Sequence, residues 1–208
     1  MTSLFLVRHG VTAHTGHRLS GRMDGIPLSD EGLEQARAAG RALATVRLAA
    51  LYSSPIERCA QTAAEIALAC GLQVELRDGL NEVEYGRWTN RSFRSVVRTK
   101  LWEQVQRFPS AARFPDGESL FEVQARAIAE VERIAAAHPR KAVGIVTHAD
   151  VIRLVAAHYL GLHIDMFQRL TIGPASTSVI GIGRLGPRVF ALNVSPGGAL
   201  PFAEGRSP

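Results

Sequence analysis

The 208-residue sequence contains no long hydrophobic run, and its uninterrupted apolar stretches are only a few residues long. A helix that crosses a membrane needs about 20 such residues, so a span of that kind is excluded. The first residues, MTSLFLVRHG, have no basic leader and reach charge at Arg8, which is unlike a secretory signal. We therefore expect a cytoplasmic protein without a membrane partner.

Cysteine and lysine are scarce, with two residues of each. Cys59 and Cys70 fall in one expected helix, too far apart along it for a disulfide, so we expect two reduced thiols. The net charge of +5 comes from arginine. Without a lysine-rich run, a groove that follows a nucleic-acid backbone is not expected, whereas arginine favours forked recognition of phosphate.

The chain also lacks the patterns of several other phosphate and metal sites. It has no P-loop sequence, and Cys59 is not part of a CxxxxxR loop. His14 and His17 have no acidic ligand cluster beside them, which favours structural or pocket-lining roles over a metal pair. We expect neither a metal nor another cofactor.

What the sequence does contain is an alternation of strand-like and helix-like segments. A Gly-Pro turn between two late apolar segments predicts a terminal hairpin. The whole pattern predicts an α/β fold with a mostly parallel open sheet, helices on both faces and a C-terminal β-hairpin. Expected strands are 3–8, 49–54, 73–76, 142–147, 177–185 and 188–194, and expected helices are 30–46, 55–70, 92–107, 119–137 and 150–160.

The length favours one domain rather than two. We expect a single domain over residues 1–195, with a helical insert at about 89–118 and a loose C-terminal tail at 196–208. The hairpin at 176–194 either ends the sheet or pairs with another chain, so a homodimer stays open.

Four side chains fall near the carboxyl ends of the expected strands: Arg8, His9, Arg58 and His148. Ligands of open α/β sheets bind outside those ends, so we expect the four to converge on one crevice. Such a cationic cluster suits a phosphate dianion and its transition state. An imidazole can attack phosphorus only when one ring nitrogen is unprotonated and aimed.

Four separated segments match, in order, the motifs of a known family. They are LVRHG with Thr12, the arginine segment SSPIERCAQTA, the acid segment LNEVEYGRW and the second histidine segment VTHADVIR. Together they cover nearly the full domain. The chain resembles the histidine phosphatase superfamily, the phosphoglycerate-mutase-like group, and is nearer its small bacterial phosphatases than its mutases.

The resemblance implies a metal-independent phosphomonoester hydrolase that acts on a small phosphorylated metabolite. His9 would attack phosphorus and form a phosphohistidine, while Arg8, Arg58 and His148 hold the phosphoryl oxygens. Glu82 would protonate the leaving oxygen and then take a proton from the attacking water.

Other positions are expected to bind substrate. The resemblance places Ser20 and Gly21 on the substrate side of the pocket and Ser119, within a Gly-Glu-Ser segment, at its border. Arg22 and Arg87 are included from their position alone, as cations for a charged part of the substrate.

The sequence departs from the family pattern at two places and leaves one ambiguity. The first loop is one residue shorter, so either His14 or Thr15 replaces the family's phosphate-contacting asparagine. THAD stands where many members have His-Gly, which leaves Ala149 to supply a backbone donor at a helix start. Glu84 competes with Glu82 for the role of proton carrier.

Two other functions stay open. A phosphoglycerate-type mutase would use the same phosphohistidine, but the mutases carry a longer basic insert than residues 89–114 provide. A non-catalytic phosphate-binding protein is disfavoured because both His9 and Arg58 are present.

Overall fold

The computed structural model describes residues 1–202 and contains one six-stranded sheet in the order β3-β2-β4-β1-β5-β6. Four neighbouring strands run parallel, while β5 pairs antiparallel with β1 and forms a hairpin with β6. The predicted α/β class, mostly parallel sheet and terminal hairpin are confirmed. The strands are β1 (Thr2–Arg8), β2 (Leu48–Ser53), β3 (Val74–Leu76), β4 (Ala142–Thr147), β5 (Thr177–Gly183) and β6 (Gly186–Val194).

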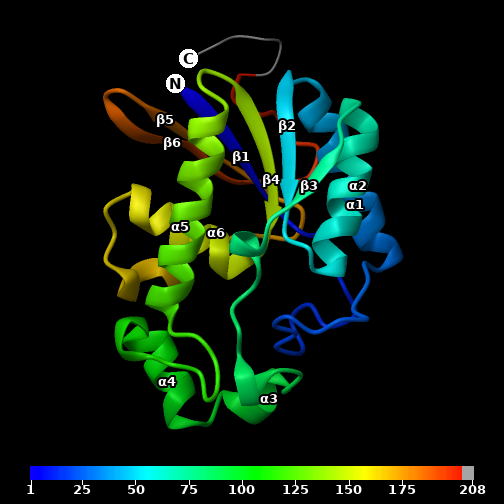
Figure 1. The fold of residues 1–208 in the computed structure, drawn as a ribbon. Coiled ribbons are helices and arrows are strands. Elements are labelled where there is room, and N and C mark those ends of the chain that lie inside the picture. Colours follow the sequence, from blue (N-terminus) through cyan, green and yellow to red (C-terminus); the bar gives the residue numbers. More distant parts are fainter. Residues whose placement is uncertain (203–208) are drawn as a thin grey trace.

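Helices cover both faces of the sheet (Figure 1). Successive side chains of a strand point to opposite faces, so apolar residues of one strand enter the core on both sides of the sheet. In β1, Leu4 and Leu6 pack in the core beneath α5 and α6, whereas Phe5 and Val7 pack in the core beneath α1 and α2. All four side chains are at most 1% exposed, so β1 is buried on both faces. The helices are α1 (Asp30–Ala44), α2 (Glu57–Cys70), α5 (Leu120–Ala137) and α6 (Ala149–Tyr159).

The insert lies beyond the carboxyl ends of the parallel strands, as Figure 1 shows. The single helix predicted for 92–107 is wrong, because the segment forms two short helices, α3 (Phe93–Val96) and α4 (Lys100–Arg107). Thr99 separates them, with an extended backbone and a side chain that accepts a hydrogen bond from Trp102 N. Because Thr99 caps α4 with its side chain, α3 must end before it. The helical spacing of apolar residues does not reveal such a cap.

Capping side chains also fix where the long helices start. Ser29 caps α1, and Ser119 forms a capping box with Glu122 at the start of α5. Pro55 lies outside α2 rather than in its first turn, because Ile56 is still extended. Short 3-10 helices complete the fold at η1 (Asp78–Leu80), η2 (Gly86–Trp88), η3 (Pro109–Ala111) and η4 (Ile164–Arg169).

The segment after the hairpin packs on the domain as far as it is described. Leu200 is 8% exposed, and the ring of Phe202 lies 4.8 Å from that of Phe190. The rest of the predicted loose tail, 203–208, lies outside the described residues. Cys59 and Cys70 both lie on α2 as free thiols. Within residues 1–202, none of the helices has the length and apolar character of a membrane span.

Candidate active site

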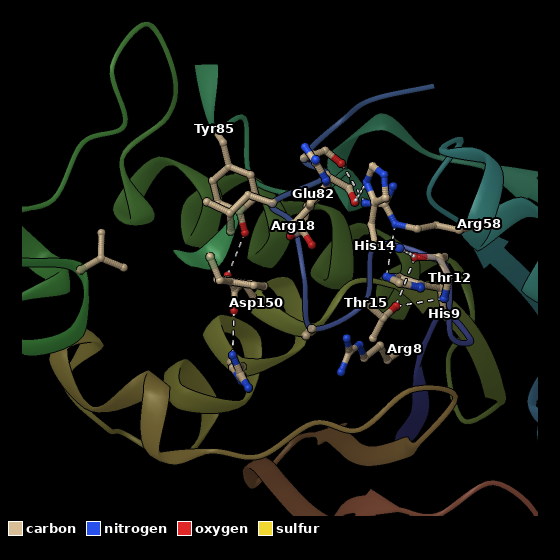
Figure 2. A pocket seen from close by; sticks show the side chains of 18 of the residues that line it. Arg8, His9, Thr12, His14, Thr15, Arg18, Arg58, Glu82, Tyr85 and Asp150 are labelled. Atoms are coloured by element: carbon tan, nitrogen blue, oxygen red, sulfur yellow. Dashed lines mark hydrogen bonds and ion pairs between the residues drawn. The ribbon is translucent and has the colours of Figure 1, made fainter. Parts of the chain in front are cut away.

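A cavity of about 360 Å³ lies at the carboxyl ends of the parallel strands. Segments far apart in sequence form it: the end of β1 with its following loop, the start of α2, the acid segment, the insert and the start of α6 (Figure 2). Nine of the residues expected in the site line this cavity. They are Arg8, His9, His14, Thr15, Ser20, Gly21, Arg58, Glu82 and Ala149.

His9 is 6% exposed and its ring is fixed at both nitrogens. Nδ1 lies 2.7 Å from the carbonyl oxygen of Gly10, and Arg58 Nε donates to Nε2 at 3.2 Å. Nδ1 must therefore carry the proton, which leaves Nε2 unprotonated, with its lone pair accepting from Arg58 Nε. Burial and the charges of Arg58 and Arg8 hold the pKa of His9 well below its usual 6.5. The ring is a neutral nucleophile.

The position of His9 depends on a close backbone approach. A Cβ on Gly32, in the first turn of α1, would lie 2.1 Å from Val11 O, and one on Gly10 would lie 2.4 Å from Gly32 O. Only glycine at both places lets the loop after β1 rest on α1. Gly10 N also donates to Thr62 Oγ1 on α2 at 3.1 Å, which anchors the loop from a second side.

Arg58 and Arg8 form a cationic nest beside His9. Arg58 is 2% exposed and donates from Nη2 to Gly21 O at 2.8 Å, while Arg8 Nη1 donates to Ile172 O at 2.7 Å. Among the described residues, the buried atoms Arg58 Nη1 and Arg8 Nε have no hydrogen-bond partner. Buried guanidinium nitrogens without an acceptor are costly in a folded protein, and an anion bound in the nest would satisfy them.

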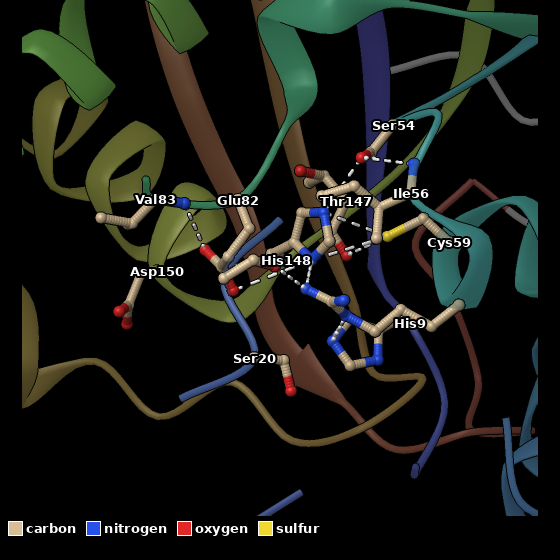
Figure 3. A network of polar contacts seen from close by, with 12 residues as sticks. His9, Ser20, Ser54, Ile56, Cys59, Glu82, Val83, Thr147, His148 and Asp150 are labelled. Carbon is tan, nitrogen blue, oxygen red and sulfur yellow. Dashed lines mark hydrogen bonds and ion pairs between the residues drawn. The ribbon is translucent and has the colours of Figure 1, made fainter. Parts of the chain in front are cut away.

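His148 contacts Arg58 but does not line the cavity, and Figure 3 shows it within a network of polar contacts near Ser54, Cys59 and Glu82. Its side chain is fully buried, with Nδ1 3.2 Å from Arg58 Nη2 and Nε2 3.0 Å from Ser54 Oγ. Ser54 in turn donates to Asn81 Oδ1 at 3.0 Å, so His148 carries its proton on Nε2 and accepts from Arg58. Burial, Arg58 and His9 keep its pKa well below the usual value. In this arrangement His148 orients Arg58.

Glu82 lies in the cavity wall, 9% exposed, with Oε2 3.7 Å from His148 Nδ1. Burial and the nearby charge of Asp150 raise its pKa to about 7, against the opposing effect of Arg58 and Arg8. A carboxyl group with this pKa can both donate and accept a proton near neutrality. The competing Glu84 is more exposed, accepts from Gly86 N and does not line the cavity.

The backbone that carries Glu82 is held by a clamp of three charged side chains, Arg126, Arg22 and Glu118. Arg126, on α5, donates to the carbonyls of Gly79, Asn81 and Glu82 at 3.1, 2.7 and 3.0 Å. The same guanidinium pairs with both carboxylate oxygens of Glu118 at 2.8 and 3.0 Å. Arg22 Nε donates to Glu82 O as well, at 3.0 Å.

The loop after β1 presents several polar groups to the cavity. His14 Nδ1 lies 3.2 Å from Ser20 Oγ, and Thr15 Oγ1 accepts from Thr12 N at 2.9 Å. His14 and Thr15 both line the cavity, so lining alone does not separate the two candidates for the asparagine position. Ala149 is the first residue of α6, and it brings the amino-terminal end of that helix to the cavity.

Three side chains expected to bind substrate are not brought to the cavity. Arg22 belongs to the clamp instead. Arg87 is 74% exposed and pairs with Asp116 at 3.0 Å, so it faces solvent. Ser119 caps α5 and bonds to Glu122. Position near a motif, for Arg22 and Arg87, and the family resemblance, for Ser119, did not reveal the direction in which these side chains point.

The cavity also contains residues to which no individual role was assigned from the sequence, although several of them, such as Thr12, belong to the matched motifs. Asp150 accepts from Tyr85 Oη at 3.1 Å and from Arg153 Nη1 at 2.9 Å. Asp150 and Arg153 are three positions apart within VTHADVIR and therefore share a face of α6. Their pairing could have been inferred from this spacing in the sequence. The remaining members are Thr12, Gly16, Arg18, Leu19, Phe93, Trp102, Val105, Gln106, Phe114 and Gln168.

The arrangement is suited to phosphoryl transfer. It combines a neutral imidazole with an unprotonated ring nitrogen, a buried and a partly buried guanidinium group with unused donors, and a carboxyl group whose pKa is about 7. Among residues 1–202, no cluster of three or more His, Cys, Asp or Glu side chains is arranged to hold a metal ion.

Comparisons with known proteins agree with this chemistry. The family model of the histidine phosphatase superfamily (branch 1) matches residues 4–195. Phosphoserine phosphatase 1 of Hydrogenobacter thermophilus is 31% identical over 201 residues, 94% of this chain and 93% of its own. A Yersinia pestis protein named probable phosphoglycerate mutase is 29% identical over 86% of this chain and 84% of its own.

The solved structures show the same fold. A mycobacterial glucosyl-3-phosphoglycerate phosphatase superposes with a TM-score of 0.85 at 25% identity, over 93% of this chain and 99% of that one. The predicted enzyme class, a histidine-type phosphatase, is thereby confirmed. By its sequence, its fold and the match over residues 4–195, the chain belongs to the histidine phosphatase superfamily (branch 1).

Proposed function

We propose that this protein hydrolyses phosphomonoesters of small metabolites in two steps through a phosphohistidine on His9. The observation that carries the proposal is the unprotonated Nε2 of a neutral His9, set beside Arg8 and Arg58 and within the same cavity as Glu82. Relatives named as phosphatases of phosphoserine and of glucosyl-3-phosphoglycerate support a small phosphorylated metabolite as substrate.

In the first step, the Nε2 lone pair of His9 bonds to phosphorus while the bond from phosphorus to the leaving oxygen breaks. Protonated Glu82 transfers its proton to that oxygen, so the product departs as an alcohol and Glu82 becomes a carboxylate. The proton on Nδ1 stays on the ring and is donated in a hydrogen bond to Gly10 O. This hydrogen bond stabilises the positive charge that develops on the ring.

In the second step, the Glu82 carboxylate takes a proton from a water molecule as the water oxygen attacks phosphorus. The bond from phosphorus to Nε2 breaks, its electron pair returns to His9, and inorganic phosphate leaves. Glu82 is then protonated again and the cycle is complete. A pKa of about 7 suits a group that gives a proton in one step and takes one in the next.

The arginines supply the positive charge that phosphoryl transfer requires. The unpaired Arg58 Nη1 and Arg8 Nε can each donate to an equatorial oxygen of the transferring group. As phosphate enters, Arg58 Nε exchanges its bond with His9 for a phosphoryl oxygen, which frees Nε2 for attack. His148 keeps Arg58 oriented during this exchange.

The test is hydrolysis of p-nitrophenyl phosphate in the presence of excess EDTA, with wild type, His9→Ala and His17→Ala. We expect wild type and His17→Ala to be active with the chelator present and His9→Ala to be inactive. His17 is an exposed histidine of the same loop that does not line the cavity, so it is a matched control. Activity that persists in His9→Ala would refute the mechanism.

The intermediate and the mutase alternative are tested separately. Rapid quenching with a radiolabelled ester should give a protein-bound phosphate that is labile in acid and stable in base, present in wild type and absent from His9→Ala. Incubation of phosphoglycerate with a bisphosphate primer tests isomerisation. Isomerisation without release of inorganic phosphate would show that the protein is a mutase and overturn the proposal of hydrolysis.

A further inference from the structure

The side of the cavity formed by the insert is mostly apolar and aromatic, with Gln106 as its polar member. Phe93 of α3, Trp102 and Val105 of α4, and Phe114 line it, beside Tyr85 from the acid segment. Val105 and Phe114 are 5% and 3% exposed and belong to the core, whereas Phe93 and Trp102 are only partly buried. Two partly exposed aromatic rings that line a cavity remain available to pack against a ligand. We call Phe93 and Trp102, with the buried Val105 and Phe114 behind them, the aromatic wall.

The rings of the aromatic wall pack against one another or against Tyr85. Phe93 and Trp102 pack edge to face with centroids 5.8 Å apart, and Phe114 packs edge to face on Tyr85 at 4.8 Å. The Tyr85 hydroxyl is itself held by Asp150 at 3.1 Å. Because these side chains are already ordered, a ligand that packs on them loses little binding energy to side-chain ordering.

The cationic nest of Arg8 and Arg58 determines which part of a substrate contacts the aromatic wall. With the phosphoryl group held by Arg8 and Arg58, the leaving oxygen must face Glu82 to receive its proton. The rest of the leaving group then extends into the remaining cavity, towards the insert. The cavity of about 360 Å³ lies within the range of roughly 300–1,000 Å³ typical of small-molecule sites, so it holds more than a phosphoryl group.

We propose that the preferred substrates are phosphomonoesters whose leaving group carries an apolar group of about the size of an aromatic ring, which packs on Phe93 and Trp102. The inference rests on the proposed function and specifies its substrate class. A small, fully polar leaving group would leave the aromatic wall in contact with water and gain nothing from it.

The experiment compares 2-phenylethyl phosphate with ethyl phosphate. Both esters release a primary alcohol, so the chemical step is matched and the difference in kcat/KM reports the contact with the ring. We expect wild type to favour 2-phenylethyl phosphate by about tenfold or more, the effect of burying one aromatic ring. Inhibition by phenylphosphonate and methylphosphonate, which cannot be hydrolysed, gives the same comparison for binding alone.

The variants are Phe93→Ala and Trp102→Ala, with Phe93→Leu and Trp102→Leu to preserve packing of the insert. We expect each alanine variant to lower the preference ratio by about three- to tenfold and each leucine variant to lower it less. Phe121→Ala is the matched control, because Phe121 is a 50% exposed aromatic residue of α5 that does not line the cavity. It should leave both activities unchanged.

The outcomes separate this inference from the proposed function. If wild type hydrolyses both esters with equal kcat/KM, or if the leucine and alanine variants keep the wild-type ratio, the substrate class is wrong while the phosphatase mechanism stands. If wild type hydrolyses neither ester nor p-nitrophenyl phosphate, the proposed function itself is wrong.

Discussion

Arg126→Lys is expected to impair hydrolysis of esters with poor leaving groups far more than hydrolysis of activated esters. Arg126 donates to three carbonyls of the acid segment, including Glu82 O at 3.0 Å, and forms a two-point pair with Glu118. Lysine keeps the charge but has no fork, so it cannot make these bonds together. Among residues 1–202, Arg22 Nε is then the one remaining donor to the Glu82 carbonyl.

The magnitude follows from the role of Glu82. A displacement of about 1 Å in a positioned group costs on the order of 10²-fold in rate, and a general acid is worth roughly 10²- to 10⁴-fold. An alkoxide leaving group needs the proton of Glu82, whereas p-nitrophenolate departs without it. We expect Arg126→Lys to lower kcat/KM by about 10²-fold for ethyl phosphate and by less than about threefold for p-nitrophenyl phosphate.

The assay measures kcat/KM for both esters in four proteins. Glu82→Gln shows the full loss of the acid, and Arg133→Lys is the control, since Arg133 is a 64% exposed arginine later on the same helix that pairs with Glu130. A merely structural defect in Arg126→Lys would lower both activities by one common factor, and that result would refute the clamp. If Glu82→Gln itself failed to discriminate between the esters, the general acid would be misassigned.

Four further predictions follow from the site. The kcat/KM profile for ethyl phosphate should have an acid limb below pH 6.5 from His9 and an alkaline limb near pH 7 from Glu82, the latter absent in Glu82→Gln. Asp150→Asn should move the alkaline limb to lower pH, because the Asp150 charge helps to raise the pKa of Glu82. The folded-state pKa of Glu82 lies above the ordinary 4.5, so the stability that its protonated carboxyl contributes is lost as pH rises from 4.5 through about 7. Urea denaturation at pH 8 should therefore find Glu82→Gln more stable than wild type by on the order of 1–3 kcal/mol. Gly32→Ala should lower the free energy of unfolding by about 1–3 kcal/mol, despite the helix propensity of alanine, since its Cβ would lie 2.1 Å from Val11 O; a stabilised variant would contradict the close approach.

The sheet and the nest were predictable because both depend on local patterns. Short apolar runs that end abruptly mark buried strands, and Arg8, His9 and His148 follow such runs directly. The carboxyl ends of parallel strands meet at one edge, so these side chains had to lie near one another once the sheet formed. The sequence also shows that Arg58 follows β2 within a few residues, which brings it to the same edge.

The clamp was not predictable, because its contacts join distant segments. Arg126 lies in the interior of α5, 44 positions from Glu82, and it has the local appearance of a solvated helix arginine. Arg22 was expected to bind substrate, and only the fold shows that its side chain turns to Glu82 O. The insert is a similar case, since the cap at Thr99 decides where its helices divide and therefore which aromatic rings line the cavity.

One physical cause, burial, prepares both the nucleophile and the acid. Removal from water disfavours charge, so it lowers the pKa of His9 and raises that of Glu82, which leaves the imidazole neutral and keeps the carboxyl protonated below about pH 7. The arginines act on His9 in the same direction as burial but on Glu82 in the opposite direction, and without burial they would leave Glu82 ionised. The alkaline limb of the activity profile is therefore sensitive to how well the insert excludes water from the cavity. The acid limb depends on it too, because burial is the largest cause of the low pKa of His9; water that enters would raise this pKa, against the opposing effect of Arg58 and Arg8.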